Sequence, residues 1–362
     1  MKEYKNPTIK DLARECNVST ATASKALNNT GRVSDDTRKR VKLIADKIGY
    51  TPNVFASSLK AVRTNTIGLC FHNVFSGHFW PEVYKGIDSY CLENNLYPII
   101  SNSNNNSDRE EEIINKYISM KVDGIIIVPT LQTKKSLYEK LMKTKIPFVF
   151  LDSYADINSF DYVGTDNYNS GILLAKYLIN KGYKDIAIML GGHVKWNTSL
   201  NNEKVTHDNL GIRPSSILLR YKGFCDELKT HNIIPFIIDE KRDIEPPYIY
   251  GYEVTKKNIN LFLDKKYSVL VCLTDSHAIG AYRALNEYDI KVGKDLSVTG
   301  YNNDPICDFI SPRLTTLSQD KFELGVNAIQ LLSNKINDPL LKPKKILLQG
   351  EIIERDSCNT QK

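Results

Sequence analysis

The sequence predicts a small all-α head that contains a helix-turn-helix, followed by an α/β core of two doubly wound lobes. The first part of the chain has the pattern of short, capped, amphipathic helices. Beyond Thr64, short apolar runs alternate with helical stretches. Such alternation favours parallel sheets that are covered by helices on both faces. A chain of 362 residues is also too long for one small domain.

The first helix is predicted to begin after Thr8, and Asp11 completes a capping-box pattern three residues later. Asn17 is expected to end this helix. Its buried face is predicted from apolar residues at helical spacing, which are Ile9, Leu12, Ala13 and Cys16.

Ser19 is predicted to cap a second helix, which runs to about Asn28. The residues that can pack inward are Ala23, Ala26 and Leu27. The residues expected to face outward are Thr20, Ala21, Thr22, Ser24 and Lys25. Small side chains allow a helix to approach DNA closely, and a lysine can reach guanine O6 and N7. The second helix is therefore suited to the major groove.

Ser34 is predicted to cap a third helix, with acidic residues Asp35 and Asp36 at its positive end and Gly49 at its stop. Its apolar stripe is predicted from Val41, Ile44, Ala45 and Ile48. Its cations Arg38 and Lys39 are expected to act alike, adding affinity for DNA of any sequence.

The positive charge of the chain is concentrated at its beginning. Residues 1–63 contain 13 lysines and arginines against 6 acidic residues, whereas the remainder contains 35 against 36. The excess behind the formal net charge of +6 therefore lies in the first sixth of the chain. Basic charge confined to one small segment is typical of a nucleic-acid contact.

Other features exclude several classes of protein. The cysteines are single and odd in number, and the histidines lack metal-ligand spacing, so we expect reduced thiols and no metal site. We find no Gly-rich phosphate loop, no HExxH and no GxSxG, so an enzyme is not expected. No stretch approaches 18 apolar residues and the polar N-terminus does not look like a signal peptide, which predicts a cytoplasmic protein without a membrane span.

The elements of the core follow in order. Strands are predicted at residues 66–71, 97–101, 124–128, 148–151, 185–190, 269–273 and 296–300. Helices are predicted at residues 80–94, 109–121, 171–181, 222–230, 254–265 and 278–288. Residues 102–107 read as a loop. The longer segment 191–219 is either a loop that covers a cleft or a disordered insertion. In such folds, ligands bind at the carboxyl ends of the strands.

The pattern of the three helices continues through residues 49–53, 56–60 and 63–69. The whole run of residues 8–69 resembles the head and linker of the LacI/GalR family of bacterial transcription regulators. Core landmarks continue the resemblance at residues 121–127, 163–167, 220–224, 274–281, 296–303 and 311–317. The resemblance implies a DNA-binding domain over residues 1–51, a hinge helix over 52–63 and an effector-binding and dimerisation domain over 64–362, similar to periplasmic sugar-binding proteins. We expect lobe 1 at about 64–190 and 318–345, and lobe 2 at about 191–317 and 346–357.

The resemblance also assigns DNA contacts. Its base-reading positions are Thr20, Ala21 and Lys25. The positions that usually touch phosphate are Ser19, Ser24, Asn28, Ser34, Thr37 and Tyr50. The hinge positions are Asn53, Ala56 and Leu59, and an apolar wedge such as Leu59 can kink DNA from the minor groove. Lys25 stands where the family usually has arginine. Ser57 stands where many members have arginine in the hinge. Both departures predict altered DNA binding.

The effector contacts of the family correspond to Asn73, Phe79, Trp80, Arg220, Asp275 and Asn302. Of Phe79 and Trp80, one is expected to belong to the core, and Tyr248 and Tyr250 are weaker candidates. Polar planar groups and aromatic faces suit a carbohydrate or a nucleobase. Asn302 replaces a common aspartate, which favours an unusual effector.

These observations together predict a sequence-specific DNA-binding regulator, and more specifically a repressor. We expect a homodimer on a palindromic operator, controlled by a small molecule such as a sugar and needing no cofactor. The core alone would equally fit a solute-binding protein without DNA function, but the basic head argues against it. A sugar-metabolising enzyme with a DNA-binding head would need a catalytic constellation that we do not find.

Overall fold

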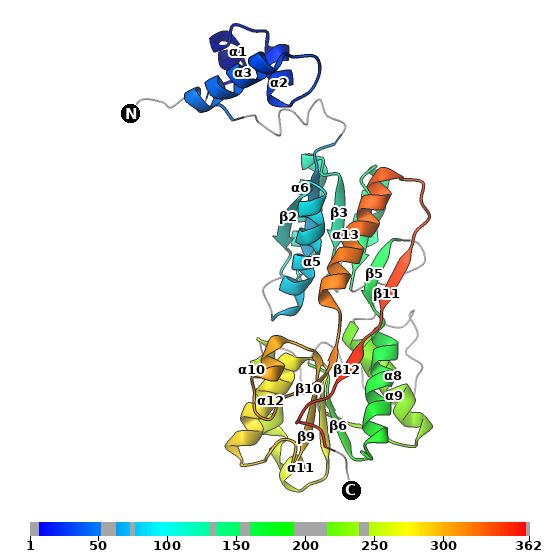
Figure 1. The fold of residues 1–362 in the computed structure, drawn as a ribbon. Coiled ribbons are helices and arrows are strands. Elements are labelled where there is room, and N and C mark those ends of the chain that lie inside the picture. The colour runs from blue at the N-terminus through cyan, green and yellow to red at the C-terminus, as the bar shows by residue number, and fades with distance from the viewer. Residues whose placement is uncertain are drawn as a thin grey trace. The chain divides into compact units, whose positions relative to one another are not determined.

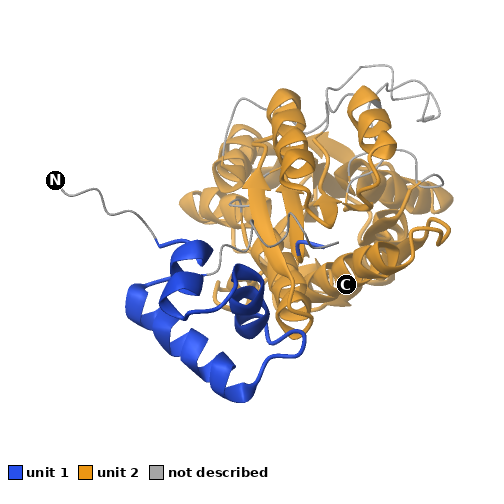
Figure 2. Cartoon of the chain, turned by 90° about the horizontal axis from the view of Figure 1, so that it is seen from above, with its two compact units in different colours: residues 1–64 blue, residues 65–362 orange. Residues whose placement is uncertain are grey.

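The computed structural model describes residues 7–51, 63–72, 77–130, 135–152, 160–191, 216–238 and 246–359. The chain divides into two compact units, residues 1–64 and residues 65–362, which Figure 2 colours separately. No helix within the described ranges is long and apolar enough to cross a membrane.

The head consists of three short helices, α1 (Ile9–Glu15), α2 (Thr20–Leu27) and α3 (Asp35–Ile48). The predicted capping box is present at α1, where Thr8 accepts from the Asp11 amide and Asp11 accepts from the Thr8 amide. Gly49 ends α3 in a left-handed conformation, as predicted. A small core joins the three helices and contains Leu12, Cys16, Ala26, Val41 and Ala45.

The first lobe of the core is built on a parallel sheet in the order β11-β5-β4-β3-β1-β2. Its strands are β1 (Thr66–Phe71), β2 (Tyr97–Asn102), β3 (Gly124–Ile127), β4 (Phe148–Leu151), β5 (Tyr162–Thr165) and β11 (Lys345–Leu348). Its helices are α5 (Phe79–Glu93), α6 (Ser107–Met120), α7 (Lys135–Lys143) and α13 (Lys321–Asn337). In Figure 1, α5 and α13 lie side by side. A Cβ on Gly86 would lie only 2.1 Å from the Phe322 carbonyl oxygen, so this close packing requires glycine.

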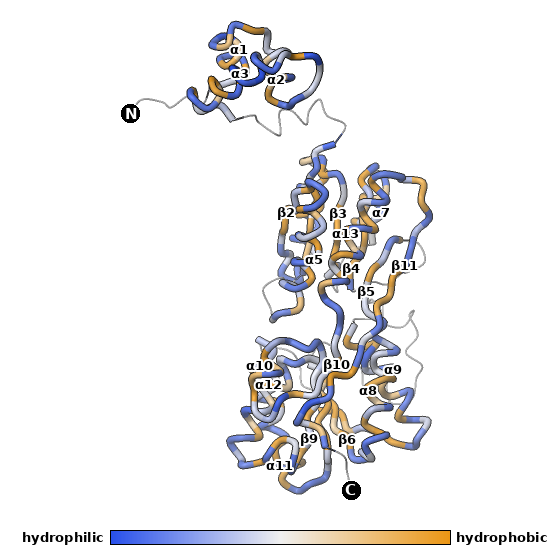
Figure 3. The backbone as a smooth tube through the Cα atoms, viewed as in Figure 1, coloured by the Kyte–Doolittle hydropathy of each residue, from blue (hydrophilic) through white to orange (hydrophobic). Residues whose placement is uncertain are grey.

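The second lobe has a sheet in the order β12-β10-β9-β8-β6-β7, in which only the β10–β12 pair is antiparallel among the described strands. Its strands are β6 (Ile186–Met189), β7 (Phe236–Ile238), β8 (Val269–Cys272), β9 (Ser297–Asn302), β10 (Thr315–Ser318) and β12 (Glu351–Ile353). Its helices are α8 (Asn167–Asn180), α9 (Ser216–Thr230), α10 (Pro247–Lys257), α11 (Ile259–Leu263), α12 (Asp275–Glu287) and the 3₁₀ turn η2 (Pro305–Asp308). One hydrophobic cluster packs α8 and α9 on the sheet, and another packs α10 and α12. The sheet is therefore covered on both faces, and Figure 3 shows the hydrophobic character of inner strands such as β6.

The chain passes between the lobes three times, after β5, after β10 and after β11. The structure corrects both lobe boundaries that the sequence predicted near residues 190 and 345. The sheet of lobe 2 already contains β6, and α8 packs against α9, so lobe 1 ends its first segment at about β5. The whole of β11 pairs with β5 and belongs to lobe 1. Hydrophobic pattern identifies a strand but not the sheet that it joins.

Candidate functional sites

The surface of α2 has the character that the sequence predicts. Ser19 caps the helix, accepting from the Thr22 amide at 3.0 Å, and Ala23 and Ala26 are fully buried against the head core. The predicted DNA contacts that are exposed are Ser19, Thr20, Ala21, Ser24, Lys25, Asn28 and Ser34. Thr22 is half-buried, and its hydroxyl lies 2.8 Å from that of Ser19. This face therefore offers small side chains and a single cation.

The two ends of α3 supply the remaining predicted contacts of the head. Ser34 caps the helix, and its hydroxyl lies 2.8 Å from that of Thr37, which is half-buried. Tyr50 is half-buried against the head core, and burial raises the pKa of its phenol. A neutral phenol can donate a hydrogen bond to a phosphate oxygen. Asn53, Ala56, Ser57 and Leu59 lie outside the described residues, as does the predicted hinge helix between residues 52 and 62.

Arg220 lies at the carboxyl edge of the second sheet and is only 4% exposed. Its Nε donates to Asn167 Oδ1 at 2.8 Å, and its Nη1 donates to the carbonyl oxygen of Leu273, next to the end of β8, at 3.0 Å. Its guanidinium lies 3.7 Å from the ring centroid of Tyr301 in β9. These contacts fix the guanidinium plane. Among the described residues, the hydrogen bonds of this guanidinium come from Nε and Nη1.

Asp275, the first residue of α12, is completely buried. Its Oδ1 accepts from the Thr316 hydroxyl at 2.6 Å and its Oδ2 from the Asp304 amide at 2.7 Å. Burial, followed by the charge of Asp304, raises the pKa of Asp275 to about 6. Both oxygens thus join α12 to β10 and η2. Contact of Asp275 with an effector stays a prediction.

Asn302, the last residue of β9, links the two lobes. Its backbone has a φ of 122°, which is unusual for a residue other than glycine. Its Oδ1 accepts from Gln319 Nε2 at 2.7 Å, and Gln319 Oε1 accepts in turn from the Thr165 hydroxyl at 2.7 Å. One glutamine therefore connects the chain crossings after β5 and β10 to the carboxyl end of β9.

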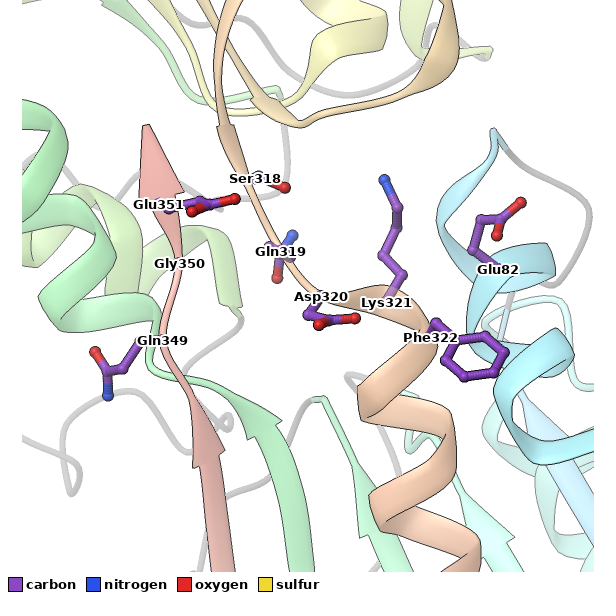
Figure 4. A pocket seen from close by; sticks show the side chains of 9 residues that line it. All are labelled: Glu82, Ser318, Gln319, Asp320, Lys321, Phe322, Gln349, Gly350 and Glu351. Atoms are coloured by element: carbon purple, nitrogen blue, oxygen red, sulfur yellow. The ribbon is translucent and has the colours of Figure 1, made fainter. Parts of the chain in front are cut away.

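A second interaction between the lobes begins at Lys321, the first residue of α13. Its Nζ donates to the carbonyl oxygens of Asn302 at 2.6 Å and Asn303 at 3.1 Å, and lies 3.4 Å from Asp304 Oδ1. Both side chains of the Lys321–Asp304 pair are at most 9% exposed. Figure 4 shows Lys321 extending from the start of α13 toward the second lobe.

The predicted aromatic residues separate into different environments. Trp80 is 5% exposed and packs in the core of lobe 1 against Phe71 and His72, whereas Phe79 is half-buried at the start of α5. The prediction that one of the pair belongs to the core is therefore confirmed for Trp80. Tyr250 is also buried, and Tyr248 is 54% exposed. Asn73 and residues 192–215 lie outside the described residues.

Several residues of this region were not selected from the sequence. Asp152 follows β4, is 8% exposed and has a positive φ of 66°. Burial raises the pKa of Tyr301, the residue that stacks with Arg220, and the negative charge of Asp152 raises this pKa further. Asn167, Asp304, Gln319 and Lys321 also lie at strand ends or chain crossings. The position of Asp152 directly after a buried strand was the available signal.

A separate polar pocket of about 550 Å³ opens beside the chain crossings (Figure 4). Its lining residues are Glu82, Ser318, Gln319, Asp320, Lys321, Phe322, Gln349, Gly350 and Glu351. None of the predicted effector contacts belongs to this set, so the pocket flanks the crossings and does not coincide with the Arg220 region.

The fold and these sites define a DNA-binding transcriptional regulator with a ligand-binding core. Residues 8–53 match the model of bacterial regulatory proteins of the lacI family, and residues 64–206 match that of the periplasmic binding proteins and sugar binding domain of the LacI family. Residues 175–358 match a periplasmic binding protein-like domain.

Full-length relatives give the same result. The chain is 31% identical over 356 residues to the transcriptional repressor PurR of Actinobacillus pleuropneumoniae, covering 97% of this chain and 98% of the relative. It is 30% identical over 358 residues to the transcriptional regulator RegA of Clostridium saccharobutylicum, covering 97% and 98%. The chain therefore belongs to the LacI family.

Solved structures agree with this fold. The Lac repressor dimer bound to operator and the anti-inducer ONPF superimposes with a TM-score of 0.82, 22% identity and coverage of 98% of this chain and 100% of that chain. A LacI family regulator from Enterococcus faecalis with bound ribose gives a TM-score of 0.68, 28% identity and coverage of 82% and 100%.

Proposed function

We propose that this regulator is a repressor that binds a palindromic operator as a homodimer and responds to a sugar or sugar derivative held at the carboxyl ends of the strands. The observation that carries the effector part is Arg220, a buried guanidinium that Asn167, Leu273 and Tyr301 hold in place and whose Nη2 has no hydrogen bond to any described residue. A planar donor of this kind suits hydroxyl and carbonyl oxygens. Asp152 and Asn302 supply polar groups in the same region.

The comparisons support the same proposal. The ribose-bound regulator shows that a relative of this fold takes a sugar, and PurR relatives are named as repressors. Effector contacts are proposed for Asn73, Phe79, Arg220, Asp275 and Asn302. A solute-binding protein without DNA function is not favoured, because residues 8–53 match the regulatory head. We infer that the chain binds its ligand without converting it and works on DNA in the cytoplasm.

In the head, the proposed base readers are Thr20, Ala21 and Lys25. The proposed phosphate contacts are Ser19, Ser24, Asn28, Ser34, Thr37 and Tyr50, and the proposed hinge contacts are Asn53, Ala56 and Leu59. Two copies of the recognition helix would meet two half-sites, as two-fold symmetry requires.

The test combines selection of DNA fragments by the full chain, footprinting of the selected site, and repetition with a panel of sugars. We expect a two-fold symmetric footprint whose occupancy changes with one class of sugar. A monomer that protects an asymmetric site would contradict the dimer. Occupancy that no sugar or sugar derivative changes, together with calorimetric binding of another metabolite, would contradict the effector class.

A further inference from the structure

Three hydrogen bonds from Arg38 converge on the turn between α2 and α3. Its Nε donates to the Val33 carbonyl oxygen at 3.2 Å, its Nη1 to Asn29 Oδ1 at 3.4 Å and its Nη2 to the Gly31 carbonyl oxygen at 3.0 Å. Every guanidinium nitrogen is thus engaged with the protein. These bonds give Arg38 a place in the turn that the expectation of a general cation near phosphate, shared with Lys39, did not include.

The turn that Arg38 holds has an uncommon backbone. Asn29 and Gly31 have φ values of 53° and 67°, both in the left-handed region. The Thr30 amide donates to the Lys25 carbonyl oxygen at 3.0 Å, which fastens the turn to the end of α2. The planar fork of an arginine can fix several acceptors at once, which a lysine cannot do.

The turn lies against the side chain of Lys25. A Cβ on Gly31 would be 3.1 Å from Lys25 Cδ and 3.5 Å from Cε. The methylene stem of Lys25 therefore runs along the bare backbone of Gly31. A lysine stem is flexible, so a fixed wall on one side restricts where its ammonium group can go.

We propose that Arg38 is a positioning residue for sequence recognition. It fixes the turn, the turn orients Lys25, and base preference at the position read by Lys25 depends on Arg38 without contact between Arg38 and DNA. This inference rests on the proposed base-reading role of Lys25.

The test uses the full chain and four variants: Arg38→Lys, Lys25→Ala, their double substitution and Lys39→Gln. Arg38→Lys keeps the charge and removes the planar fork. Lys39→Gln, at an exposed position on the same helix, removes a charge and leaves the turn intact. Affinity is measured at several salt concentrations for the selected operator, for operators with single base-pair changes and for unrelated DNA.

In Arg38→Lys we expect discrimination to fall about tenfold at one base pair, with unchanged affinity for unrelated DNA and an unchanged salt slope. In the Lys25→Ala background, Arg38→Lys should cause no further loss at that base pair, because Arg38 affects base preference only by orienting Lys25. Lys39→Gln should weaken all sequences alike and reduce the salt slope by about 0.9 if Lys39 meets one phosphate.

Three outcomes would overturn the proposal: wild-type discrimination in Arg38→Lys, an equal loss at every base pair, or a loss that adds fully to that of Lys25→Ala. An unfolded head would also lose its affinity for unrelated DNA, so an equal loss at every base pair counts against the proposal when that affinity is intact. If Lys25→Ala alone left base preference unchanged, the base-reading role itself would fail, and the proposal with it.

Discussion

Among the residues of α2, Lys25 alone carries a charge, and it is exposed. We expect Lys25→Ala to change base preference, with a loss of roughly 1–3 kcal/mol for the preferred base pair, because a lysine donates to guanine in the major groove. Binding titrations on operators with single base-pair changes measure this. Equal weakening on every sequence would show that Lys25 contacts phosphate.

A second residue-scale prediction concerns Asp275, whose folded pKa of about 6 lies above the usual value near 4. The folded chain therefore binds this proton more tightly than the unfolded chain. The stability that protonation adds is complete below about pH 4 and is lost as the pH rises through 6. Asp275→Asn removes this titration. Relative to the wild type, its free energy of unfolding should increase by on the order of 2 kcal/mol between pH 4 and pH 7.

Urea unfolding of both proteins across this pH range checks the expectation for Asp275. Asp308→Asn is the matched control, because its bond with Arg355 lowers the pKa of Asp308. The stability that this bond gives is lost only as the pH falls below about 4, so the control difference should stay nearly constant between pH 4 and pH 7. A difference for Asp275→Asn that stays constant with pH would contradict the prediction.

The sequence predicted single residues well where the determining contacts are local. Thr8 and Asp11 are three residues apart, and both of their predicted hydrogen bonds form. It could not predict the surroundings of Asp275, because Asp304 and Thr316 reach it from distant parts of the chain. A buried carboxylate and a ligand-binding carboxylate look alike at the end of a strand.

At the scale of elements, the start of α13 holds the end of β9 through Lys321. Lys321→Met would leave Asp304 buried without its cation, which should cost about 3 kcal/mol of stability. Because the pair joins two lobes, we also expect a changed effector affinity. Urea unfolding and calorimetry measure the two effects.

Lys335 provides the matched control for this prediction. It lies in the same helix and pairs with Asp161 at 3.2 Å, and both residues belong to lobe 1. Lys335→Met should lower stability while leaving effector affinity unchanged. If the two variants changed effector affinity equally, the link through Lys321 would have no special role.

Long apolar and amphipathic patterns predicted most inner strands and most helices. Five strands of three or four residues each were not predicted from the sequence, which are β5, β7, β10, β11 and β12. So short a run shows no period, and glycine or hydroxyl residues interrupt the apolar pattern of β5 and β10. The sequence also missed α7 and α13, although α13 supplies Leu324 and Ile329 to the core of lobe 1. Sheet membership required the pairing of strands, which a single pattern does not contain.

At the scale of the whole molecule, effector and DNA binding belong to separate compact units. We expect Arg220→Ala to lose effector binding at least tenfold while keeping the DNA affinity of the unliganded protein, because coupling acts only through bound effector. Calorimetry and operator titrations with and without effector test both parts. Unchanged effector affinity would place the pocket elsewhere, and lost DNA affinity without effector would indicate a structural defect.

Because the chain passes between the lobes three times, the two lobes are not completed in the order in which they begin during translation. The core of lobe 1 combines Ile67 and Leu69 with Leu324 and Leu332, so it cannot close until the ribosome has added α13. Strands β6 to β10 of lobe 2 are all made before that point. Most of lobe 2 is therefore translated as an insert within lobe 1, and only β12 follows the last strand of lobe 1. A chain that stops before α13 would carry a DNA-binding head with an unfinished first lobe, exposing apolar strands that α13 normally covers.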